Sequence, residues 1–105
     1  MQACEVVLLD DAIEDLRAIR AYVCRMSRSR QVADAYLKKM RTRLRPLDYT
    51  AEAQPRFFYA DGSDSGYRFI PVERHVAFFA IEGDQVRIKR ILHQRMDSGF
   101  WIGRM

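Results

Sequence analysis

Apolar residues recur at helical spacing in two segments of the first half of the chain. In the first segment the apolar positions, three or four residues apart, are Ile13, Leu16, Ile19, Val23 and Met26. Asp10 and Asp11 precede them, and an aspartate side chain can accept hydrogen bonds from the free N–H groups of a first helical turn. We therefore expect an amphipathic helix from Asp10 to about Met26.

The second segment predicts another amphipathic helix, spanning Arg30–Leu44 or extending to Leu47, with Ser27 or Ser29 as its cap. Pro46 has no N–H to donate, so the helix should fray or end there. The apolar stripe of this helix is Val32, Ala33, Tyr36, Met40, Leu44 and Leu47. Because only about three residues separate the two helices, they should form an antiparallel hairpin.

Extended segments flank the pair of helices. Before it, Cys4–Leu9 is a short apolar run that predicts a buried strand. After it, Asp48–Ser65 contains proline, glycine and small polar residues and predicts a long loop, with a brief extended piece at Arg56–Tyr59. Three strands joined by short turns at Glu73-Arg74 and Gly83-Asp84 should follow: Tyr67–Val72, Val76–Glu82 and Val86–His93.

The predicted fold class is α+β, with an N-terminal strand, an antiparallel helix hairpin and a three-stranded antiparallel meander. All of it fits one domain of residues 1–105, because a chain of this length is too short for two ordinary cores. Pro71 cannot donate to a ladder of hydrogen bonds, so its strand should lie at an edge of the sheet or contain a bulge.

The meander has positive charge on its strands as well as in its turns. Strict alternation places Val86, Ile88, Arg90 and Leu92 on one face of the last strand. We expect this face to meet the core, with Arg90 as its exception. If the helix hairpin covers that side, the opposite face should gather Arg68, Arg87, Lys89 and His93. Such a surface is either solvated or offered to an anionic partner.

Composition narrows the possible classes of protein. An apolar fraction of 49% and a charged fraction of 30% are typical of a folded globular protein rather than a disordered one. The net charge of +4 makes an acidic partner plausible, and the bases are concentrated between Arg25 and Arg45. Cys4 and Cys24 are too few for a disulfide framework. Since we find neither a signal peptide nor a membrane-spanning run, we expect a cytoplasmic protein without a membrane partner.

Three stretches, in this order and spacing, point to a family. They are DDAIEDLRAIRAYV (Asp10–Val23), GYRFIPVERHVAFFAIEGDQVRI (Gly66–Ile88) and ILHQRMD (Ile91–Asp97). They resemble the opening helix, the arginine-led and aromatic-rich strands with their acidic turn, and the closing strand of the RelE/ParE superfamily. The members of this superfamily are the toxins of bacterial type II toxin–antitoxin pairs, and the closing strand is nearer to the ParE branch.

The resemblance implies a toxin that is neutralised by a small cognate antitoxin, here ParD-like, whose flexible C-terminal part wraps it. For the ParE branch it implies inhibition of DNA gyrase by binding, with neither a catalytic constellation nor a cofactor. For the RelE branch it implies cleavage of mRNA in the A site of the ribosome. We favour the ParE-like function and keep the ribosome-dependent endoribonuclease as the alternative; an inactive relative that only binds an antitoxin is a third possibility.

An endoribonuclease would need a base, an acid and cations for the phosphate charge that develops. The candidates are His93 with Arg68, Arg87, Lys89 and Arg95. The chain lacks the tyrosine that several RelE-like nucleases place near the C-terminus. His93 could equally bond to the tail or belong to a partner interface, and His75 is expected to make local bonds in its turn. A metal site would need both histidines and further ligands, so we expect none.

Binding functions suggest two other sets of residues. Contact with gyrase or another target would use Arg68, Arg87, Lys89, His93, Phe100 and Trp101. The tail that contains Phe100 and Trp101 either folds back to cap the core or anchors a partner. The basic segment Lys38–Arg45 is either a solvated face or a site for an anionic partner. The antitoxin should occupy a groove between the helix hairpin and the sheet edge, and the candidate lining residues, which could equally be core, are Leu16, Ile19, Arg20, Tyr22 and Tyr36.

Overall fold

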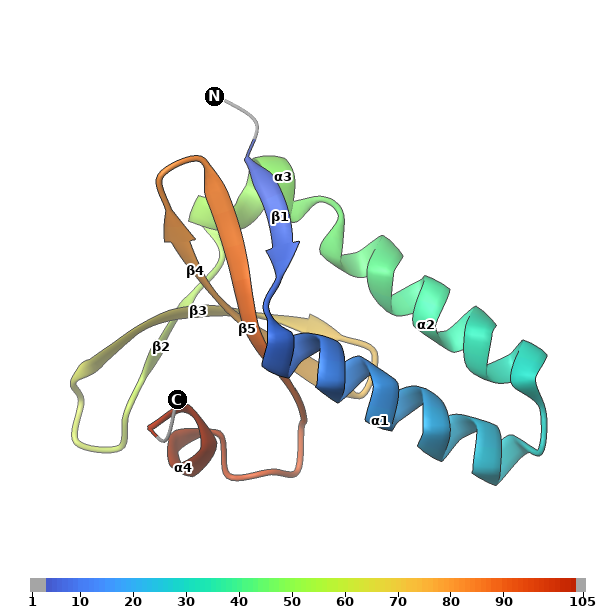
Figure 1. Ribbon diagram of the computed structural model, residues 1–105. Helices are drawn as coiled ribbons and strands as arrows, with labels where there is room; N and C mark the ends of the chain where they lie inside the picture. Colours follow the sequence, from blue (N-terminus) through green and yellow to red (C-terminus); the bar gives the residue numbers. More distant parts are fainter. Residues whose placement is uncertain (1–3, 104–105) are drawn as a thin grey trace.

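Two long helices, α1 (Asp10–Ser27) and α2 (Arg30–Leu44), form an antiparallel hairpin against one face of a five-stranded sheet (Figure 1). The computed structural model describes residues 4–103. The strands are β1 (Glu5–Leu8), β2 (Arg56–Phe58), β3 (Asp64–Val72), β4 (His75–Glu82) and β5 (Gln85–His93). The shorter elements are α3 (Leu47–Thr50), the 3-10 turn η1 (Ala51–Ala53) and α4 (Ser98–Ile102). The predicted α+β class is therefore confirmed.

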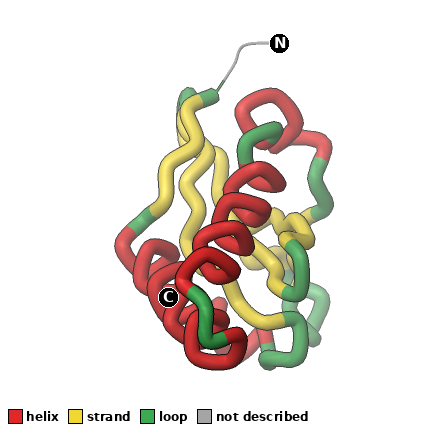
Figure 2. The backbone as a smooth tube through the Cα atoms, turned by 90° about the vertical axis from the view of Figure 1, so that its right-hand side faces the viewer, coloured by secondary structure: helices red, strands yellow, loops and turns green. Residues whose placement is uncertain are grey.

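The helix hairpin follows the predicted boundaries, and Figure 2 views it from its tip. Ser29 caps α2, because its Oγ accepts a hydrogen bond from the Val32 N–H at 3.1 Å. At the start of α1 the expected aspartate cap is wrong: the helix begins after Leu9 without a side-chain capping bond. Met26 and Val32, predicted on apolar faces, are 68% and 49% exposed because the tip of the hairpin extends beyond the sheet.

The sheet has the order β1-β5-β4-β3-β2, with β1 parallel to β5 and the other pairs antiparallel. The meander of β3, β4 and β5 was predicted, but β1 is an edge strand with half-buried side chains, not a buried one. The predicted long loop is also partly wrong, because residues 47–53 form α3 and η1. β2 pairs with β3 only as far as Arg68, so Pro71 lies where β3 has an open edge, as expected.

A β-bulge at Lys89 changes which side chains of β5 face the helices. Phe79 is opposite Ile88 and Phe78 is opposite Arg90, so Lys89 is left without a partner in β4. Before the bulge Ile88 faces the helices, and after it Ile91 does so. The prediction that Arg90 and Leu92 share a face with Ile88 is therefore wrong, because strict alternation does not survive an extra residue.

Arg90 and Leu92, which the bulge turns away from the helices, lie on the side of the sheet that has a second, smaller core. There Phe78, Leu92 and Ile102 are each 2% exposed, with aromatic residues of β2 and β3 around them. Ile102 belongs to α4, so the tail folds back and caps this core. The Asp97 side chain caps α4 by accepting from the Phe100 N–H at 3.2 Å. None of the helices in the described part of the chain is long and apolar enough to span a bilayer.

Candidate functional site

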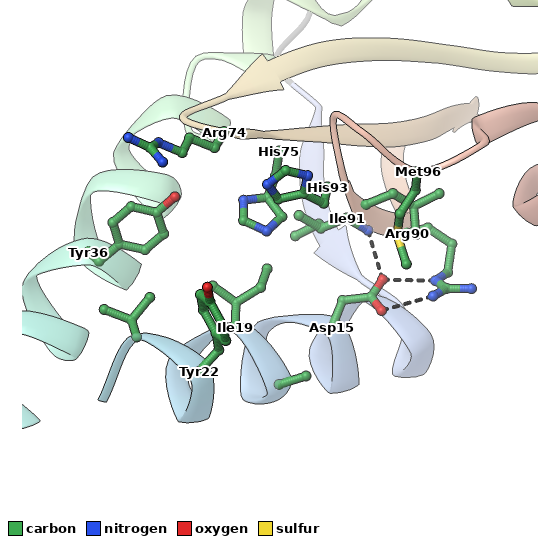
Figure 3. Close-up of a pocket in the computed structure, with 13 residues that line it drawn as sticks. Asp15, Ile19, Tyr22, Tyr36, Arg74, His75, Arg90, Ile91, His93 and Met96 are labelled. Atoms are coloured by element: carbon green, nitrogen blue, oxygen red, sulfur yellow. Dashed lines mark hydrogen bonds and ion pairs between the residues drawn. The ribbon is translucent and has the colours of Figure 1, made fainter. Parts of the chain in front are cut away.

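A pocket of about 590 Å³ lies between the helix hairpin and the adjoining ends of β4 and β5 (Figure 3). The apolar periodicity of α1 supplies one wall through Ile19, Tyr22 and Val23, and Tyr36 of α2 continues it. The complete lining is Asp15, Ala18, Ile19, Tyr22, Val23, Tyr36, Arg74, His75, Arg90, Ile91, Leu92, His93 and Met96. We call this space the hairpin pocket.

Two histidines meet at the strand ends of the hairpin pocket. His75 begins β4 and His93 ends β5; they are register partners, with ring centroids 5.2 Å apart and ring planes at 82°. The Arg95 N–H donates to His93 Nδ1 at 3.1 Å, so the proton of a neutral His93 must be on Nε2. His75 Nδ1 is buried and has no hydrogen-bond partner among residues 4–103. Burial, and then the neighbouring His93, lower the pKa of His75, and Asp15 opposes them.

An ion pair joins α1 to β5 beside the histidines. Arg90 donates from Nε and Nη2 to the Asp15 carboxylate at 2.8 and 3.0 Å, and the Ile91 N–H donates to Oδ2 at 2.8 Å. The two side chains are only 18% and 15% exposed. The hydrogen bond that Arg90 donates to Asp15 is the main cause that raises the pKa of Arg90. Trp101 of α4 packs on the same guanidinium, 5.5 Å from Cζ to the ring centroid. The pair thus ties α1, the sheet and the tail together.

The predicted antitoxin-binding residues are divided between the pocket, the core and the outer surface. Ile19, Tyr22 and Tyr36 line the hairpin pocket, and Tyr22 is 56% exposed. Leu16 is core, at 5% exposure, because it points between α1 and the sheet. Arg20 lies outside the lining and donates to Asp34 of α2 at 2.8 Å, an exposed pair that raises the pKa of Arg20.

The predicted basic face of the sheet does not form. Arg68 is opposite the core residue Phe79, on the side of the helices, and donates to the Gln54 carbonyl at 2.7 Å. Arg87 is opposite Ala80, on the other side, and pairs with Glu82 at 3.2 Å. Strand register therefore separates the two arginines, and the prediction that they share a surface is wrong.

The other residues predicted for RNA cleavage or target binding are also distributed over different parts of the surface. Lys89 lies beside Arg87, and both line a shallow hollow with Asp10 and Asp11 at the start of α1. His93 lies in the hairpin pocket, away from this hollow. Arg95 is exposed just after β5. Phe100 is 47% exposed, and its ring meets the half-buried Trp101 edge-on at 5.6 Å. The five residues proposed for RNA cleavage are thus not assembled around one phosphate position.

The pocket residues that sequence reasoning missed include Arg74, His75, Arg90 and Met96. The pairing of His75 with His93 was available in principle, because a two-residue turn at Glu73-Arg74 followed by a hairpin at Gly83-Asp84 brings the ends of β4 and β5 together. The role of Arg90 could not be predicted from the sequence, since it depends on the β-bulge at Lys89. Groups of three or more potential metal ligands do not occur among the residues that the structure describes.

Comparisons with known proteins agree with this architecture. A sequence profile described as "ParE toxin of type II toxin-antitoxin system, parDE" matches residues 6–98. Among solved structures, "Chromosomal ParDE TA system from P. aeruginosa" is similar, with a TM-score of 0.72 and 19% identity over 87% of this chain and 96% of that one. At this level of identity the likeness establishes a shared fold. A search of curated protein sequences gave no match.

Proposed function

Because the chain belongs to the ParE toxin family of type II toxin–antitoxin systems, we propose that it inhibits DNA gyrase by binding and that a ParD-like antitoxin neutralises it. The observation that supports the proposal is the extent of the family match. Residues 6–98 include both long helices and all three strands of the meander. The match is thus to the whole toxin architecture and not to a single motif.

The positions of the candidate nuclease residues favour binding over catalysis. A general acid or base must lie within hydrogen-bond reach of the atom that it serves, together with the cations that stabilise the developing charge. His93 lies in the hairpin pocket, whereas Arg87 and Lys89 line the hollow at the start of α1. Arg68 is engaged with the Gln54 carbonyl. The alternative function, mRNA cleavage on the ribosome, therefore lacks an assembled phosphate clamp around its proposed catalyst.

The hairpin pocket is the proposed antitoxin site. Large apolar side chains are exposed along it and toward the tip of the hairpin: Tyr22 at 56%, Met26 at 68%, Val32 at 49% and Met96 at 41%. Exposed apolar residues gathered in this way are typical of interaction surfaces. An antitoxin segment that buries these side chains gains binding free energy, but part of that free energy is offset by the conformational entropy that a flexible segment loses when it becomes ordered.

We assign target binding to the face of the sheet opposite the helices. Arg87 and Lys89 lie on that face, and so do Phe100 and Trp101 of the tail. Arg68 and His93, which were predicted for the same role, are excluded from it because they lie on the helix side. The proposed surface combines two cations with two aromatic rings, a composition that suits a protein or protein–DNA partner.

The experiment compares the two possible targets directly. Purified toxin is added to gyrase with supercoiled plasmid, and in parallel to ribosomes programmed with mRNA. We expect trapped cleaved DNA in the first assay and intact mRNA in the second. Arg87→Ala combined with Lys89→Ala should weaken the gyrase effect, while Arg25→Ala combined with Arg30→Ala, at exposed positions near the tip of the helix hairpin, serves as the charge-matched control. A-site cuts that disappear in His93→Ala, without any effect on gyrase, would replace the proposal with the nuclease function.

A further inference from the structure

The hairpin pocket has an excess of positive groups once its internal pairs are accounted for. The charged and titratable groups around the two histidines are Asp15 and Tyr22 of α1, Tyr36 of α2, Arg74, Arg90 of β5 and Arg95. The only carboxylate among them is Asp15, and both of its oxygens already accept hydrogen bonds from Arg90. Arg74 has no ion pair within residues 4–103. A second carboxylate would therefore find cations that are not yet neutralised.

The histidine pair provides donors of the right kind. His93 accepts at Nδ1 from the backbone, so its Nε2 is the nitrogen that donates. The His75 ring meets it edge-on, and both rings lie between Arg74 and the Tyr22 side of the pocket in Figure 3. The neighbouring His93 is one of the causes that lower the pKa of His75, and an anion beside the rings would act in the opposite direction. We call the part of the pocket around Arg74, His75 and His93 its floor. This floor is suited to bind a carboxylate together with a proton.

We propose that the floor of the hairpin pocket holds a carboxylate side chain of the antitoxin, an aspartate or glutamate flanked by apolar residues, between Arg74 and the His75–His93 pair. This inference rests on the proposed antitoxin site and specifies the chemistry of its occupant. The apolar neighbours of the acidic residue pack on Ile19, Tyr22 and Tyr36. Binding takes up a proton at the histidine pair, so the complex is tighter at pH 6 than at pH 8, within the ordinary range of histidine titration at about 6.5.

Calorimetry with the proposed ParD-like antitoxin tests this inference. The wild-type affinity should rise roughly tenfold from about pH 8 to about pH 6, equivalent to one unit of pKa shift in one histidine. The variant His75→Gln/His93→Gln should show a flat profile over the same range. Arg74→Gln should weaken binding at both pH values and keep the pH dependence, and Arg56→Gln, at an exposed position on β2 outside the pocket, should match the wild type.

A second set of variants identifies which carboxylate of the antitoxin binds in the pocket. Each aspartate and glutamate of the antitoxin segment is changed in turn to asparagine or glutamine. One substitution should abolish the pH dependence with the wild-type toxin and cause little further loss with the double histidine variant. Histidine resonances in NMR titrations of the free toxin and the complex should move to a higher pKa on binding.

The possible failures are distinguishable. If the antitoxin binds, Tyr22→Ala weakens it, and the affinity is flat with pH or equally pH-dependent in the histidine variant, the carboxylate inference is wrong while the antitoxin site stands. If the antitoxin binds but Tyr22→Ala has no effect, the segment lies elsewhere and the inference fails with the site. If the antitoxin does not bind at all, the proposed function itself fails. Circular dichroism of every variant confirms that it is folded before any of these outcomes is read.

Discussion

Asp15 makes the most concentrated set of polar contacts between α1 and the sheet, so its removal should destabilise the fold strongly. Its carboxylate accepts three hydrogen bonds, from Nε and Nη2 of Arg90 and from the Ile91 N–H. The change Asp15→Ala deletes all three and leaves a guanidinium whose side chain is 18% exposed without its ion pair, although the contact with the Trp101 ring remains.

The expected loss of stability in Asp15→Ala follows from the burial of the Asp15–Arg90 ion pair. Removing one partner of a fully buried ion pair costs about 3–5 kcal/mol. Both side chains here keep some contact with water, at 18% and 15% exposure, which lowers the expected cost to about 2–4 kcal/mol. For a domain of this size each kcal/mol shifts Tm by roughly 4–8 °C, so a decrease of at least about 8 °C is expected. Asp15→Asn retains one acceptor and should fall between the wild type and Asp15→Ala.

Urea unfolding followed by circular dichroism measures the free energy of unfolding of each variant. The matched control is Asp34→Ala, which removes an ion pair with the same 2.8 Å distance, to Arg20, but at 44% and 64% exposure. Water screens such an exposed pair, so its removal should change the free energy of unfolding much less than the removal of Asp15. If Asp15→Ala and Asp34→Ala cost the same within about 0.5 kcal/mol, the reasoning is refuted, and apolar packing alone holds α1 on the sheet.

Three further predictions concern single residues. Glu73 has a φ of 57°, in the left-handed region, so Glu73→Gly should stabilise the turn by about 0.5–1 kcal/mol in thermal unfolding, and a loss of stability would contradict this. The pKa of His75 is lower in the folded state than in the unfolded state, so the folded protein binds fewer protons. The free energy of unfolding should therefore fall as the pH drops below about 6.5. Urea titrations at several pH values should show a weaker pH dependence for His75→Gln than for the wild type. Ile102 is 2% exposed in the second core, so Ile102→Ala should cost about 2–3 kcal/mol, whereas a change below about 0.5 kcal/mol would show that the tail is not a structural cap.

Local patterns predicted the elements well because their causes are local. The spacing of apolar residues located α1 and α2, Ser29 is one of the two serines predicted as the cap of α2, and Pro46 marked the end of that helix. The turns between β3, β4 and β5 followed from their residues. Helix burial was less well predicted: Met26 has the right spacing, but it lies beyond the sheet that would have covered it.

The candidate site was predicted only in part. Ile19, Tyr22 and Tyr36 were predicted to line a groove between the helix hairpin and the sheet edge, and they do line the pocket. The predicted basic surface failed because Arg68 and Arg87 lie on different strands, and their relative orientation depends on the register that each strand adopts against β4. A side chain on a strand changes face with a shift of one residue, so no argument within one strand could have aligned them.

The order of residues by itself determined a helix hairpin, a meander and a positively charged chain, because hydrophobic periodicity, turn chemistry and charge are read within a few neighbouring residues. Tertiary structure alone decided that β1 lies parallel to β5, that the bulge at Lys89 turns Arg90 toward Asp15 and Trp101, and that Tyr22 of α1 lines the same pocket as the histidine pair. These contacts join positions far apart in the chain. They exist because packing of the two cores selects one register for the whole sheet, and that register determines which polar groups meet.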